Sequence, residues 1–200
     1  MNSAVIKYGL IGLAVAGFFG YQAINKAANP QTADLGQVLD RTEFAIETYE
    51  EHAKSNASST TLSDSQVEEF GMFLAEVMNT EPRFYDDQLG MKVQEDALFL
   101  GFKDSNANGI QDSGEKKVFS VEIDAENQRL IATDETGESV GHRFSGTGIL
   151  TGYLIGSMLG RQRAAGITPN SFNNRNVTSR SNYKPSARTR TRTGGSRSGK

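Results

Sequence analysis

Oxygen-bearing side chains at regular spacing are the feature of this 200-residue sequence best suited to chemistry. Within residues 104–115, short carboxylates and amides occupy alternate positions, a glycine follows, and a glutamate closes the segment. Ca²⁺ takes about six to eight oxygen ligands, and alternate short side chains can turn inward around one ion while the glycine permits a sharp turn. The pattern therefore predicts a calcium site. Its expected ligands are the side chains of Asp104, Asn106, Asn108, Asp112 and Glu115 and the backbone carbonyl of Ile110.

The spacing matches the pattern D-x-[DN]-x-[DN]-G-x5-E, and the segment resembles the calcium loop of EF-hand proteins over these twelve residues. Two features depart from that family. Gln111 stands where EF-hand loops usually carry an aliphatic residue, and the flanking sequence is typical of strands rather than helices. The segment is therefore also similar to isolated aspartate-rich calcium loops between strands in bacterial surface proteins. Three carboxylates in a single loop predict a dissociation constant of about 10⁻⁵–10⁻³ M.

A polar β-hairpin is the alternative interpretation of the same residues. Asn108-Gly109 would then simply supply the turn. That interpretation accounts for two residues but not for the acids at ligand spacing on either side. The calcium interpretation is therefore favoured.

The charges of the chain are sorted along the sequence. All 24 acidic residues lie between Asp34 and Glu138 together with eight basic residues, so this stretch carries a formal charge of −16. Residues 141–200 carry eleven basic residues and no acid. The sequence contains no cysteine and two histidines, which excludes thiol chemistry and makes a multi-histidine zinc site improbable. Such segregation predicts parts that face different surroundings.

The N-terminal residues 1–28 contain an uncharged apolar run, Tyr8–Ile24. Its 17 residues would span roughly 25 Å as a helix, which is the short end for a bilayer core. We predict a transmembrane anchor. A cleaved signal peptide and a buried soluble helix are the alternatives.

The hydrophobic pattern of residues 31–143 predicts one acidic α+β domain. Apolar residues recur with the period of a helix over residues 33–54 and 66–79, and Ser65 with Glu68 fits a capping box. The period then changes to two, which predicts a small antiparallel β-meander of three or four strands that carries the calcium loop. The alternating stretches are residues 98–102, 119–123 and 130–132.

The glycine spacing within residues 144–165 predicts a membrane-associated helix. Four glycines recur at intervals of four residues and would form one flat helix face, a glycine zipper, that another helix can approach closely. These residues are Gly148, Gly152, Gly156 and Gly160. The face could pack against the N-terminal anchor or against a second copy of the chain. A glycine-rich connector or a buried soluble helix is the alternative.

Residues 166–200 predict a disordered basic tail, because they are rich in polar residues and glycine and nearly devoid of apolar ones. Four arginines near its end could contact the phosphates of nucleic acid or of anionic lipid. They are Arg188, Arg190, Arg192 and Arg197. A merely solvated tail is the alternative.

Lys7 precedes the first predicted membrane segment, and Arg161 and Arg163 follow the second. By the positive-inside rule this predicts cytoplasmic termini and an extracytoplasmic acidic domain, although Lys26 would lie on the outer side. We therefore expect a bacterial inner-membrane protein that binds Ca²⁺ and has a structural or assembly role at the cell envelope. An adaptor whose arginine-rich tail binds nucleic acid or anionic lipid is the second hypothesis. No nucleophile–base pair or phosphate loop favours an enzyme, and no small-molecule substrate is identified, although a two-carboxylate hydrolase stays open.

Overall fold

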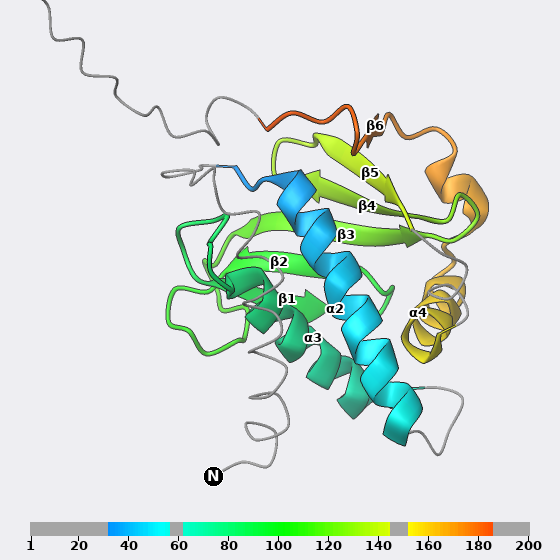
Figure 1. The fold of residues 1–200 in the computed structure, drawn as a ribbon, viewed down its shortest axis with the longest axis horizontal. Coiled ribbons are helices and arrows are strands. Elements are labelled where there is room, and N and C mark those ends of the chain that lie inside the picture. The colour runs from blue at the N-terminus through cyan, green and yellow to red at the C-terminus, as the bar shows by residue number, and fades with distance from the viewer. Residues whose placement is uncertain (1–31, 57–61, 145–151, 186–200) are drawn as a thin grey trace, which may run out of the picture.

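The computed structural model describes residues 32–56, 62–144 and 152–185. Two helices, α2 (Leu35–Asn56) and α3 (Asp64–Asn79), cover one face of a six-stranded sheet, and a third helix, α4 (Tyr153–Ala164), lies beside α2 (Figure 1). The strands are β1 (Leu89–Val93), β2 (Phe99–Lys103), β3 (Lys117–Asp124), β4 (Arg129–Asp134), β5 (Ser139–Arg143) and β6 (Thr178–Ser179).

The sheet has the order β1-β2-β3-β4-β5-β6. Strands β1 to β5 form an antiparallel meander, and β6 adds to β5 in parallel orientation. The predicted meander of three or four strands is therefore wrong in extent and in type, because the sheet is mixed. Strand β5 was missed since its sequence, SVGHR, shows little apolar alternation.

The core lies between the sheet and the two helices. Apolar residues at helical spacing on α2 and α3, such as Leu39 and Phe70, meet alternate residues of β2 and β3, such as Phe99 and Val121. The helices lie close to their predicted positions. The capping box of α3 is formed by Ser63 and Gln66 rather than by the predicted Ser65 and Glu68.

Two charged residues of α2 are buried and bind the ends of other helices. Arg41 is fully buried and donates to the carbonyl oxygens of Val77 (2.8 Å) and Thr80 (2.8 Å) at the C-terminal end of α3. Burial lowers the pKa of Arg41 to about 10. Glu50, which is 4% exposed, accepts hydrogen bonds from the backbone N–H groups of Tyr153 (2.9 Å) and Leu154 (2.6 Å) at the start of α4.

Helix α4 corrects the prediction of a membrane-associated glycine-zipper helix. Its Leu154, Ile155 and Met158 are buried in the common core, whereas Gly156 and Gly160 are exposed. None of the helices within the described ranges is long and apolar enough to cross a membrane. Glycines spaced by four residues are also compatible with a helix that buries its apolar face in a protein core, and this is the arrangement found. The predicted anchor, residues 1–28, and Gly148 lie outside the described residues.

The prediction of a disordered tail is also wrong for residues 166–185, which we call the C-terminal strap. The strap contains a short 3-10 helix, η2 (Pro169–Phe172), and strand β6. Its Arg180 pairs with Asp40 of α2 (2.7 Å), and the Tyr183 hydroxyl accepts a hydrogen bond from the Leu35 N–H (3.2 Å). Composition alone did not predict this ordered structure, because it does not show that basic residues of the strap pair with acidic residues elsewhere in the fold.

We expect that Glu50→Gln destabilises the protein by about 2–3 kcal/mol, because a charged acceptor of several buried N–H groups is replaced by a neutral amide. Urea unfolding measures this loss. Glu47→Gln is the matched control, since it makes the same chemical change at an exposed site of α2. Equal stability of the two variants would contradict the capping role. Hydrogen exchange at the Leu154 amide should accelerate only in Glu50→Gln.

The contact between β5 and α2 predicts a dependence of stability on pH. His142 Nε2 lies 2.8 Å from a carboxylate oxygen of Glu43, and this hydrogen bond raises the pKa of His142. A raised pKa in the folded state means that the contribution is fully present below the unfolded pKa, about 6.5, and is lost as pH rises through the folded value.

Between pH 6 and pH 9, the free energy of unfolding of the wild-type protein should therefore fall by up to about 1 kcal/mol more than that of His142→Gln. Urea unfolding measures both values. The two proteins share His52, so the difference isolates His142. If the free energy of unfolding changed equally with pH in the two proteins, this contribution would be ruled out.

Candidate metal centre

The predicted calcium loop connects β2 to β3, so its flanks are strands. Asp104 follows β2 directly, is 5% exposed, and donates its backbone N–H to the Gln88 carbonyl at the start of β1 (2.9 Å). The Lys103 N–H donates to the Lys116 carbonyl (3.0 Å) and closes the base of the loop. The first predicted ligand is therefore fixed to the sheet.

The backbone folds back on itself at two left-handed residues. Gly109 has φ of 74° and Ala107 has φ of 56°. Glycine adopts this conformation without the strain that a side chain brings, and a Cβ at Gly109 would meet open space, so conformation rather than packing favours glycine here. The turn brings the Asn108 and Gly109 N–H groups onto the two carboxylate oxygens of Asp104, at 3.2 and 2.8 Å.

The five predicted ligand side chains form one hydrogen-bonded group. Asn106 and Asn108 both donate their side-chain amide to the same Asp112 oxygen, at 2.8 and 2.9 Å. Glu115 reaches back across the loop and accepts from the backbone N–H groups of Asp112 (3.0 Å) and Ser105 (2.7 Å). The structure thus brings the beginning and the end of the loop together around its side chains.

The loop concentrates negative charge that its flanking lysines do not pair with. Across the described parts of the chain, no ion pair involves Asp104, Asp112 or Glu115. The three carboxylates do not by themselves gather into a compact metal-binding group within these parts. Backbone N–H and side-chain amide groups lie between the carboxylates and donate hydrogen bonds to their oxygens.

These residues fit Ca²⁺ better than a softer metal. The set offers carboxylate, amide and carbonyl oxygens and neither sulfur nor imidazole, which are the donors that zinc prefers. A half-turn of the Asn106 and Asn108 amides would replace their donors near Asp112 with oxygens. Ile110 is 65% exposed, so its side chain adds nothing to the core, and its predicted role is through the backbone carbonyl alone.

The remaining predicted site residues have different outcomes. Of the zipper glycines, Gly152 precedes α4 and packs against the Glu50 carboxylate, while the helix-packing role of Gly156 and Gly160 stays a prediction. The four tail arginines lie outside the described residues. Sequence reasoning missed a basic pocket at β4, β5 and β6, whose residues are far apart in the chain and form no motif. Comparisons with known protein families, with curated proteins and with solved structures found no match.

Proposed function

We propose that the protein binds one Ca²⁺ ion in loop 104–115 and that the ion stabilises the connection between β2 and β3. The observation that carries this proposal is the shared hydrogen bonding at Asp112, which both Asn106 and Asn108 contact. A plain turn requires Asn108 and Gly109 but gives no reason for acids at both ends of the loop to accept hydrogen bonds from its interior. A cation replaces the amide donors as the group that holds these oxygens together.

The role of the ion is structural. Asp104 is tied to β1 and β2 through its backbone, and Glu115 is next to the residue that closes the loop against Lys103. An ion held by both acids therefore links the end of β2 to the start of β3. Ligand binding to the folded state alone contributes about 2.7 kcal/mol when the ion is present at 100 times its dissociation constant.

The expected affinity suits a compartment with abundant calcium. Three carboxylates and neutral oxygen donors favour a dissociation constant of about 10⁻⁵–10⁻³ M, which is the range of weak sensors and extracellular modules. Cytosolic calcium buffers bind far more tightly. A structural or assembly role outside the cytoplasm is consistent with this range.

Calorimetric titration of the full chain with Ca²⁺ should show one site in this range. We expect Glu115→Gln to weaken binding at least about tenfold, because it removes a charged, bidentate ligand. Glu126→Gln is the matched control, since it changes an exposed acid in the β3–β4 turn, at the other end of β3. Absence of calcium heat in the wild type, or equal affinities of the two variants, would refute the site.

Asn106→Asp should have opposite effects on stability with and without the ion. Without calcium, the added carboxylate loses its donor bond and faces Asp112, so the melting temperature falls. With millimolar calcium, the fourth carboxylate strengthens ion binding, so the gain in melting temperature on adding Ca²⁺ exceeds that of the wild type. Thermal unfolding in EDTA and in calcium measures both changes. A fall of the same size in both buffers would indicate a structural defect unrelated to the ion.

A further inference from the structure

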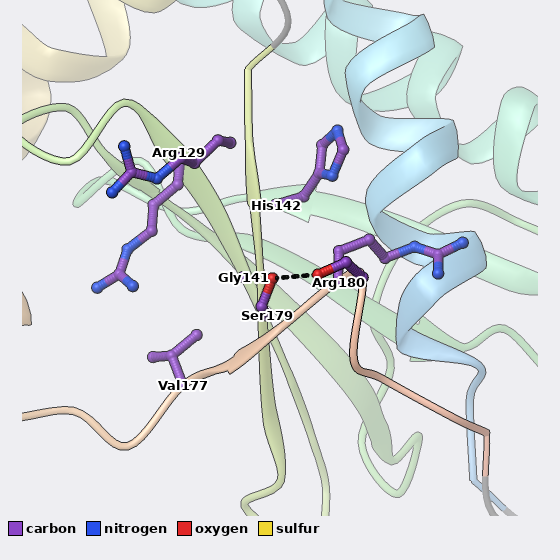
Figure 2. A pocket seen from close by; sticks show the side chains of 8 residues that line it. Arg129, Gly141, His142, Val177, Ser179 and Arg180 are labelled. Carbon is purple, nitrogen blue, oxygen red and sulfur yellow. Dashed lines mark hydrogen bonds between the residues drawn. The ribbon is translucent and has the colours of Figure 1, made fainter.

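A basic pocket of about 570 Å³ lies where β4, β5 and the C-terminal strap meet (Figure 2). Its Arg129, Gly141 and Arg143 belong to the sheet face opposite α2, because the alternate residues Leu130 and Val140 are buried in the core beneath the helices. The calcium loop is at the other end of β3. That strand has eight residues, so about 25 Å separates the two places.

Two arginines face each other directly across strands in this pocket. Arg129 and Arg143 are partners in the register of β4 and β5. Like charges in such a position destabilise a sheet, and burial in the core does not explain them, since Arg143 is exposed. Asp124 offsets part of the charge of Arg129, and an anion bound between the two arginines would remove the remaining repulsion.

The guanidinium groups of Arg129 and Arg143 have N–H donors that no acceptor among the described residues uses. Arg129 uses Nε to bind Asp124 (2.8 Å), and its two terminal amino groups contact no acceptor in the part of the chain that the structure describes. Arg143 forms no ion pair or side-chain hydrogen bond there. Guanidinium forks match the geometry of phosphate oxygens.

The rest of the pocket is shaped for a small group. Gly141 forms part of its wall, and a Cβ at this position would approach Val177 to 2.7 Å. The hydroxyls of Ser179 and Ser181 lie 2.9 Å apart, so one hydroxyl proton of the pair is left to donate elsewhere.

The other two basic residues of the pocket point away from this face. Figure 2 shows His142 and Arg180 directed toward α2, where they bind Glu43 and Asp40, while Arg129 extends in the opposite direction. Because Asp124 and Asp40 neutralise Arg129 and Arg180, the pocket retains about one positive charge, that of Arg143. This charge suits a single phosphoryl group rather than a polyphosphate.

We propose that this pocket binds the phosphoryl group of a small phosphorylated molecule. Arg143 and the terminal amino groups of Arg129 hold the phosphate oxygens, and the Ser179–Ser181 pair donates one further hydrogen bond. The volume leaves room for an organic group of modest size beside the phosphate. The site is independent of calcium binding.

The test is a titration of the isotope-labelled full chain with inorganic phosphate and with glycerol 3-phosphate, followed by amide NMR at constant ionic strength set with chloride. Shifts are expected at Gly141, Arg143 and Ser179. Arg143→Gln should weaken binding about tenfold or more, as loss of a hydrogen bond between charged groups does. Arg163→Gln, an exposed arginine on α4, should leave it unchanged.

Three results would overturn the proposal. The first is a titration that moves none of these pocket amides. The second is binding of equal strength in Arg143→Gln and Arg163→Gln. The third is a response to vesicles of phosphatidylglycerol without any response to the two soluble phosphates, since that would assign the pocket to a membrane surface. Arg129→Gln provides a second variant, with folding checked by the unchanged core amides.

Discussion

Helix α2 places a buried positive charge at the end of one helix and a buried negative charge at the start of another. A helix ends in carbonyls without partners and begins in N–H groups without partners, and its dipole favours a cation at the first place and an anion at the second. Arg41 meets the carbonyls that end α3, and Glu50 meets the N–H groups that begin α4. Both signs agree with the dipole. Burying either charge would be very unfavourable without these bonds, so they favour this packing of the three helices over one that leaves a charge unsatisfied.

The same helix also binds the strap and strand β5 through charge. Asp40 pairs with Arg180, and Glu43 with His142, on successive turns of α2. Elsewhere Arg161 pairs with Asp64 and Arg175 with Glu122. Strand β6 is only two residues long, so its ladder bonds alone give it little stability. The attachment of the strap therefore depends on the Asp40–Arg180 and Glu122–Arg175 pairs and on Phe172 and Tyr183, which are buried.

This pairing explains why the sequence misled about architecture, although the segment proposed to bind calcium does connect two strands as expected. An acidic body and a basic C-terminal region can be separated by a membrane or joined by contact, and the charge count is the same in both cases. The helices α2 and α3 were predictable, because 3.6-residue periodicity is a local property. The position of α4 was not, because it depends on Glu50, about a hundred residues away. The candidate calcium site could be proposed from sequence since its predicted ligands all lie within twelve residues, whereas Arg129 and Arg143 meet only through strand register.

The two proposed sites differ in how the fold supports them. The calcium loop projects beyond the Lys103–Lys116 closure, so its side chains can rearrange around an ion while the strands below keep their register. The phosphate pocket has no such independence, because one wall belongs to the strap and the others to β4 and β5. Weakening the Asp40–Arg180 pair should loosen that wall without touching the calcium ligands. The pocket is thus linked to α2 through the strap, and the loop is linked only to the hairpin that carries it.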